Sequence, residues 1–213
     1  ATVHYRQGDS DEDRTAYGEV VLAAIGRVPN TDADWFRSSG LKLDERGYVT
    51  VDGYGRTNLD GVWALGDITP GHALAHRAFE QGITIAEKIA GADPKPVLDD
   101  TVPQVVFSFP EAASVGLTLD QAKAREDVVE PKETAYPMLS NARMLMSGEG
   151  GSMTVVSGAF ANNPDMQVVL GVHIVSPIAS DLIAEAEQLV GNRVPLADAA
   201  RLIHPHPTFS ETL

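Results

Sequence analysis

Cysteine is absent from the 213 residues of this chain. Without a thiol, the chain can form no disulfide, no thiolate metal site and no cysteine nucleophile. Positive charge is also scarce, because 16 Lys and Arg face 30 Asp and Glu, for a formal net charge of −14. Nucleic acid and anionic membrane surfaces repel so acidic a protein, so we expect neither as a partner.

Long apolar runs are missing as well. No stretch approaches the roughly 20 residues that a membrane-spanning helix needs, and no signal peptide or lipidation motif is visible. The chain starts at Ala1 rather than Met, so an upstream targeting segment could precede it. We expect a cytoplasmic protein whose 43% hydrophobic residues suffice for a core, arranged as one large domain or two small ones.

The first part of the chain resembles the end of a sheet. Residues 3–6 are expected to form a strand, residues 8–14 an acidic turn, and residues 17–25 a nearly continuous apolar strand, which is typical where both faces of a sheet are covered. Gly and Pro then force a turn in the sequence GRVPN, residues 26–30. Since the apolar strand has nothing before it to pair with, we expect the rest of its sheet to lie upstream.

The next segment is predicted to hold a hairpin over residues 41–52, a short buried strand over residues 61–67 and a helix over residues 73–90. Gly91 is a natural C-cap for that helix. Gly82, in its interior, costs about 1 kcal/mol relative to Ala. Either the position tolerates glycine, or the helix packs closely against a ligand or a strand there.

A Pro- and Asp-containing link over residues 94–103 indicates a domain boundary near residue 100. Beyond it, Thr118 and Gln121 have capping-box spacing at the start of a short helix. Further strands are expected over residues 105–107, 136–143, 152–159 and 168–175, and further helices over residues 176–190 and 195–203. Strands with helices segregated around them indicate an α+β domain.

The sequence HPHPTFSE, residues 204–211, carries the strongest chemical signal. Its prolines fix φ and remove backbone donors, so the segment is rigid and extended. A Glu beside an imidazole raises the pKa of the ring and fixes its orientation, which suits Glu211 and His206 to moving a proton to or from a thiol of pKa about 8.5. Two other interpretations stay open: His204 and His206 bind a metal, or both are exposed on a terminal loop.

A second signal is Gly66-Asp67 at the end of a predicted strand, followed by the helix start LAHRA, residues 74–78. Glycine at a strand end lets the backbone approach a ligand, and a carboxylate beside it accepts hydrogen bonds from sugar-like hydroxyls. The helix N-terminus offers free N–H groups to an electron-rich ring edge. A lone Gly-Asp is usually a turn, but Gly-Asp followed by the LAHRA helix start is a much more specific signal of a ligand site.

Five motifs occur in the order GRVPN, TNLDGVWALGD, LAHRAFEQG, VPQVVFSFPEAASVG and HPHPTFSE. In this order and spacing they resemble the pyridine nucleotide–disulfide oxidoreductase family, and within it the dihydrolipoamide dehydrogenases. The resemblance runs from about residue 17 to the end. It implies the α+β interface (dimerisation) domain over residues 100–213, preceded by the C-terminal segment of an FAD-binding domain over residues 28–99 and a tail of an NAD-binding domain over residues 1–27.

The resemblance also implies roles for single residues. It makes His206 the acid/base, Glu211 its orienting carboxylate, His204 a supporting neighbour and Pro207 part of a cis His–Pro bond. The implied cofactor contacts are Asp67 with the ribityl chain of FAD, Leu74 and Ala75 with the flavin ring through backbone N–H groups, and Gly26, Gly66 and Pro207 near the cofactors. It implies no metal.

In this family the full-length enzyme oxidises dihydrolipoamide with FAD and NAD, and the residue matching His206 serves the flavin and disulfide of the other subunit. We therefore expect a homodimer formed through residues beyond about 100, a lipoyl substrate, and a 2-oxo acid dehydrogenase complex as partner. The redox Cys pair and both GxGxxG motifs of the family are missing here, so this chain alone is expected to bind neither cofactor. The alternatives are a quinone or other disulfide reductase of the same family, or an inactive dimerisation module.

Overall fold

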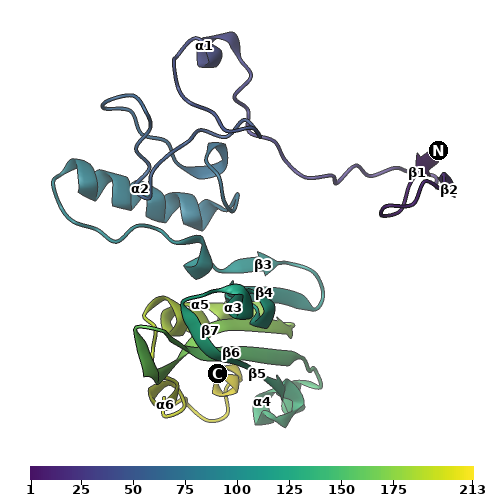
Figure 1. Cartoon of the computed structure of the whole chain (residues 1–213). Coiled ribbons are helices and arrows are strands. Elements are labelled where there is room, and N and C mark those ends of the chain that lie inside the picture. Colours follow the sequence, from purple (N-terminus) through teal and green to yellow (C-terminus); the bar gives the residue numbers. More distant parts are fainter.

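The computed structural model describes all residues, 1–213, and begins with a two-stranded hairpin at the end of an extended arm (Figure 1). β1 (Thr2–Tyr5) pairs antiparallel with β2 (Arg14–Tyr17) around the acidic turn. The predicted strand over residues 17–25 is wrong, because the chain forms no further ladder there. Side chains such as Leu22 and Ile25, 87% and 98% exposed, lie beside no partner strand, and an apolar segment becomes a strand only against one.

Residues 28–98 form a loop-rich unit, which we call the α2 unit. Its regular elements are α1 (Asp34–Arg37), the 3-10 turn η1 (Gly66–Ile68) and α2 (Ala75–Ile89). A small core of three side chains, Phe36, Val49 and Ala64, holds it together.

Two strand predictions in this unit need correction. The hairpin expected over residues 41–52 is reduced to a single bridge between Leu43 and Val49. The strand expected over residues 61–67 is wrong, because this segment makes one bridge, at Trp63, and then turns into η1. No neighbouring strand of the chain extends either bridge into a ladder.

α2 is the helix predicted over residues 73–90, starting two residues later. Gly91 ends it as predicted, at φ +84°, with its N–H donating to the Lys88 carbonyl at 3.2 Å and the Ala92 N–H donating to the Glu87 carbonyl at 3.0 Å. This pair of bonds is the Schellman arrangement. A Cβ at Gly82 would meet nothing within 4 Å, so no part of this chain requires glycine there.

The C-terminal half is built on one antiparallel sheet with strand order β3-β4-β7-β6-β5. The strands are β3 (Gln104–Val106), β4 (Glu111–Gly116), β5 (Val128–Pro137), β6 (Ser152–Phe160) and β7 (Asn163–Ser176). Helices surround this sheet in Figure 1, which confirms the α+β prediction. β6 and β7 were predicted, whereas the sequence interpretation missed β4 and most of β5.

Two helices cover the sheet. α5 (Ala179–Gly191) packs on β4 and β7 through its predicted apolar face, where Leu182, Ile183 and Ala186 are buried. α3 (Leu119–Ala124) packs on β5 and begins with the predicted capping box, since the Thr118 hydroxyl accepts from the Gln121 N–H.

The predicted strand over residues 136–143 is wrong. β5 ends at Pro137, near the beginning of this segment. The chain then continues into the 3-10 turn η3 (Met138–Ser140) and the helix α4 (Ala142–Ser147). Asn141 favours a helix here, because its side-chain oxygen accepts from the Arg143 and Met144 N–H groups and so caps α4.

The last elements are short. α6 (Leu196–Ala199) ends four residues before the helix predicted to reach residue 203, and the 3-10 turn η4 (Phe209–Thr212) closes the chain. The prolines of the HPHP segment prevent any continuation of α6 through it. No helix in the structure has both the length and the apolar character needed to cross a membrane.

Candidate functional site

His206 and Glu211 form the hydrogen-bonded pair that the sequence predicted. The imidazole Nδ1 lies 2.8 Å from Glu211 Oε1. The His206 side chain is 71% exposed and that of Glu211 only 25%, so the carboxylate lies behind the ring. One edge of the imidazole is thus held, and the edge with Nε2 is open to a second molecule.

A network of backbone hydrogen bonds fixes this pair. Glu211 Oε2 accepts from the Thr208 N–H at 2.8 Å, and the Thr208 hydroxyl donates to the Pro205 carbonyl at 2.6 Å. The side-chain amide of Asn141, which is 67 residues earlier in the sequence, donates to the Thr208 carbonyl at 3.0 Å. The His206–Pro207 peptide is cis, as predicted.

The electrostatics of the pair favour a charged carboxylate. Hydrogen bonds from the Thr208 N–H and from His206 lower the pKa of Glu211 below its ordinary value. A carboxylate opposite Nδ1 selects the tautomer that carries its proton on Nδ1, and Nε2 is then the basic nitrogen. The arrangement can therefore accept a proton at Nε2 and stabilise the resulting imidazolium.

His204 has a partner of its own. Its Nε2 lies 2.6 Å from Glu185 Oε1, and the side chain is only 15% exposed. His204 and His206 thus bind different glutamates, and no group of three His, Cys, Asp or Glu side chains is arranged to hold a metal ion. No sequence pattern pointed to Glu185, which is 19 residues from His204, on α5.

The predicted cofactor residues Gly66 and Asp67 lie at η1, in the α2 unit. Gly66 adopts φ +74°, which favours glycine, and its N–H donates to Gln81 Oε1 at 2.8 Å. The Asp67 carboxylate is 57% exposed and lies 3.6 Å from the guanidinium of Arg27, the neighbour of Gly26. The structure thus places the side chain of Arg27, the residue after Gly26, beside Asp67.

The backbone N–H groups of Leu74 and Ala75, the two predicted flavin contacts, differ in whether they already have an acceptor. The Leu74 N–H already donates to the His72 carbonyl at 3.0 Å. Ala75, the first residue of the helix, has an N–H with no acceptor in the chain. Of these two backbone groups, only that of Ala75 is available to a ligand without rearrangement.

The two groups of predicted residues do not meet within one chain. In Figure 1 the C-terminus, with η4, lies on the side of the C-terminal sheet away from α2. The terminal segment, which carries the His206–Glu211 pair, thus lies on the other side of the sheet from α2.

Sequence reasoning missed Arg77, whose side chain is only 6% exposed and pairs with Asp99 at 2.7 Å. A signal was present, because Arg77 shares one face of α2 with Gln81, Thr84 and Ile85, at helical spacing. A cation on a buried face needs a partner, and Asp99 is the acid that the returning chain supplies.

Comparisons with known proteins identify the family of this chain. The model for the dimerisation domain of pyridine nucleotide-disulphide oxidoreductases matches residues 102–213, and the model for pyridine nucleotide-disulphide oxidoreductases matches residues 3–82. Among curated proteins, the chain is 39% identical to a dihydrolipoyl dehydrogenase of Cupriavidus necator over 214 residues, which is 100% of this chain and 43% of the relative. It is likewise 39% identical to that of Geobacillus stearothermophilus, over 94% of this chain and 41% of the relative.

Solved structures show the same relationship. The crystal structure of LpdA from Mycobacterium tuberculosis matches with a TM-score of 0.82 and 31% identity, over 98% of this chain and 45% of that one. The flavoprotein disulfide reductase RclA from Escherichia coli, at 22% identity and a TM-score of 0.75, shares the fold over 95% of this chain and 47% of its own. The chain spans less than half the length of each of these relatives. Since the dimerisation-domain match alone covers more than half of the chain, and the motifs lie in the order and places described above, this chain belongs to the pyridine nucleotide–disulphide oxidoreductase family.

Proposed function

We propose that this chain is the C-terminal part of a dihydrolipoamide dehydrogenase, which converts dihydrolipoamide and NAD to lipoamide and NADH. The similarity to proteins named dihydrolipoyl dehydrogenase supports this reading. In the proposal, residues 1–27 belong to an NAD-binding domain, residues 28–99 to an FAD-binding domain and residues 100–213 to the dimerisation domain. The observation that carries it is the 2.8 Å contact between His206 and Glu211, with the other edge of the imidazole exposed.

His206 is the proton acceptor in this reaction. Glu211 keeps the proton of the free imidazole on Nδ1, so a dihydrolipoamide thiol placed at Nε2 gives its proton to that nitrogen. The imidazolium is stabilised by the carboxylate behind it. The thiolate produced is the nucleophile that thiol–disulfide exchange requires. Nε2 later releases the proton, which restores the base.

The α2 unit fits one part of an FAD. The exposed Asp67 carboxylate can accept from ribityl hydroxyls, the free Ala75 N–H can donate to the ring edge, and Gly66 and Gly26 bring the backbone close without a side chain. When bound, FAD supplies the acceptor for the two electrons of the dithiol. Its pyrophosphate has no Gly-rich loop among these 213 residues, so we expect tight binding only in a longer polypeptide.

A homodimer follows from the same assignment. The dimerisation domain exposes several large apolar side chains, among them Phe107, Phe109, Leu145 and Ile203, which are 68–97% exposed. Such side chains mark an association surface. A two-fold dimer would set the His206–Glu211 pair of one subunit against the flavin contacts of the other.

The surface charge suggests the wider assembly. At a net charge of −14, a basic segment of a 2-oxo acid dehydrogenase complex is the kind of partner that long-range attraction would favour. A cytoplasmic location is part of the same proposal.

A substrate panel tests the proposal. The full-length polypeptide, loaded with flavin, is given dihydrolipoamide with NAD, and separately a reduced nicotinamide nucleotide with a quinone or with glutathione disulfide. We expect the dihydrolipoamide reaction to have the highest kcat/KM. A higher value with a quinone or with another disulfide would replace the proposal by that activity.

A further inference from the structure

The α2 unit and the dimerisation domain meet at the 3-10 turn η2 (Asp99–Thr101). Asp99 Oδ1 accepts from Arg77 Nε at 2.7 Å, and Arg77 Nη2 donates to the Pro70 carbonyl at 2.6 Å. Gly71 makes room for this pair, since a Cβ there would collide with both the guanidinium and the Asp99 carboxylate. The buried guanidinium thus binds η2 to the first turn of α2, beside the predicted flavin contacts.

Asp100, the residue after Asp99, contacts the dimerisation domain. Asp100 Oδ2 accepts from Arg125 Nη1 at 3.0 Å, and Arg125 is the C-cap of α3 in the dimerisation domain. Arg125 is itself held by a two-bond contact with Asp127. Adjacent carboxylates of one short turn therefore bind one arginine from each unit.

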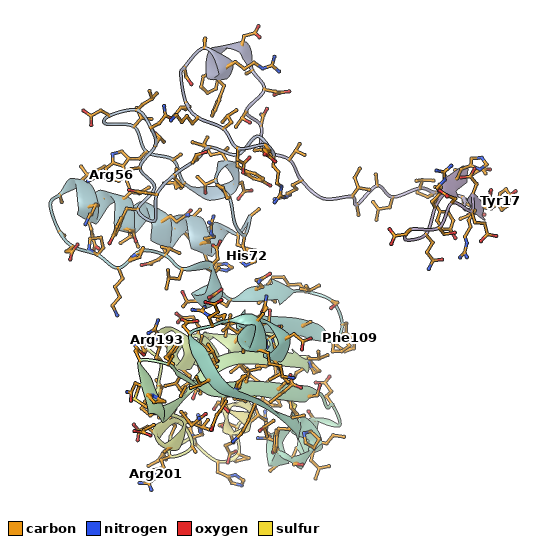
Figure 2. All side chains as sticks on the ribbon, viewed as in Figure 1. Tyr17, Arg56, His72, Phe109, Arg193 and Arg201 are labelled. Carbon is orange, nitrogen blue, oxygen red and sulfur yellow. The ribbon has the colours of Figure 1, made fainter.

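Two further contacts cross the same boundary. His76 Nε2 lies 2.7 Å from the Pro103 carbonyl, and His72 Nε2 lies 3.2 Å from Gln104 Nε2. Figure 2 shows His72 where the upper unit meets the lower one. Beside this strip, a groove of about 1000 Å³ lies between residues of α2 and residues of α5.

The chain reaches η2 by returning along α2. From Arg77 to Ile89 the helix measures about 18 Å, at 1.5 Å per residue. The eight residues 91–98, which form no regular structure beyond the Gly91 turn, can span at most about 29 Å. The linker is therefore long enough to bring Asp99 back to Arg77, with about 11 Å, or three residues, to spare.

We propose that η2 is an ionic junction that sets the orientation of the dimerisation domain relative to the start of α2, with Arg77, Asp99, Asp100 and Arg125 as positioning residues. The consequence for catalysis rests on the function proposed above. In the dimer, the orientation set at η2 decides where the His206–Glu211 pair of one chain stands relative to the flavin contacts of the other. The pairs around η2 thereby act on the thiol reaction without touching the substrate.

A distance measurement on the chain tests the junction itself. Because the sequence has no cysteine, Glu87→Cys on α2 and Lys123→Cys on α3, both exposed, can be spin-labelled without background. Labelled chain is diluted with unlabelled chain, so that only distances within one polypeptide contribute. We expect one narrow distribution, which broadens and moves in Asp99→Asn and in Arg77→Leu. The matched control is Asp93→Asn, which breaks the Lys88–Asp93 pair at the other end of α2 and should leave the distribution unchanged.

Turnover of the flavin-loaded full-length polypeptide tests the catalytic consequence. A misplacement of about 1 Å can cost up to about 100-fold in rate, so we expect Asp99→Asn to lower dihydrolipoamide turnover by about 10- to 100-fold. Reduction of a one-electron acceptor by NADH should stay near normal, which mere destabilisation would not allow. An unchanged distance distribution in both variants, or a broadened one with normal dihydrolipoamide turnover, would overturn the proposal. If the unsubstituted enzyme does not oxidise dihydrolipoamide, the proposed function fails, and the distance measurement still decides the junction.

Discussion

Each carboxylate oxygen of Glu211 has its own partner, the Thr208 N–H for Oε2 and the His206 ring for Oε1. The first bond caps η4 and the second orients the imidazole. A single side chain therefore ties the fold of the terminal loop to the direction in which His206 Nε2 points.

Replacing His206 with Gln removes the proposed base and keeps a side chain of similar polarity. We expect turnover of dihydrolipoamide in the full-length enzyme to fall by roughly 10²- to 10⁴-fold, the range for losing a general acid/base. Flavin reduction by NADH should be nearly unaffected, because it does not use this base. Stopped-flow measurement of the two half-reactions separates them.

His204→Gln is the matched control, because His204 is nearly buried against Glu185. It should be the milder change of the two. Near-normal dihydrolipoamide turnover in His206→Gln, or a larger loss in His204→Gln, would remove His206 from the proposed role.

Glu211→Gln isolates the charge of this side chain, since Gln retains the capping bond to the Thr208 N–H. The pKa of Glu211 is lowered in the folded state from its ordinary value of 4.5, so its charge stabilises the fold above that pH and ceases to do so as the pH falls below it. We expect the wild-type chain to unfold at a higher temperature than the variant at neutral pH, and the difference to shrink below pH 4.5. Thermal unfolding across that range checks this, and a pH-independent difference would contradict it.

At the scale of elements, sequence patterns predicted those structures whose signals are local. α5 has apolar residues at helical spacing, β7 contains a nearly continuous apolar run, and α2 ends where Gly91 allows the left-handed turn. The segment 17–25 was misread because an apolar run is a strand only beside another strand. The segment 136–143 was misread because the capping side chain of Asn141 outweighs strand propensity.

In the site too, contacts between residues close in sequence were predictable and contacts between distant residues were not. The His206–Glu211 contact joins residues five apart, so the sequence could suggest it. The contacts of His204 with Glu185 and of Arg77 with Asp99 join residues 19 and 22 apart, and only the fold brings them together.

Gly82→Ala tests whether α2 keeps its interior glycine for packing within this chain. The added Cβ meets no atom within 4 Å, and Ala is favoured over Gly in a helix by about 1 kcal/mol. We expect the chain to gain up to about 1 kcal/mol in free energy of unfolding, measured with urea. Gly71→Ala, at φ +112°, should lose stability instead, and a loss in Gly82→Ala would show that α2 is more tightly covered than the structure indicates.

At the scale of the whole molecule, the exposed apolar side chains predict self-association. We expect light scattering to show a dimer at tens of micromolar. Phe109→Asp should shift it towards monomer, because a charge at the centre of an apolar interface is not solvated there. Phe79→Asp, a similarly exposed position on α2, is the control and should leave the dimer intact. A strict monomer of the unsubstituted chain would contradict the assignment of the interface.

The linker over residues 91–98 has a consequence for how such proteins can vary in length over evolution. A loss of three residues would leave five, which reach about 18 Å at most, no more than the stretch of α2 they must pass. Insertions, by contrast, can bulge outward at a small entropic cost. We therefore expect relatives that keep the Arg77–Asp99 pair to tolerate insertions in this linker, but no deletion of three or more residues.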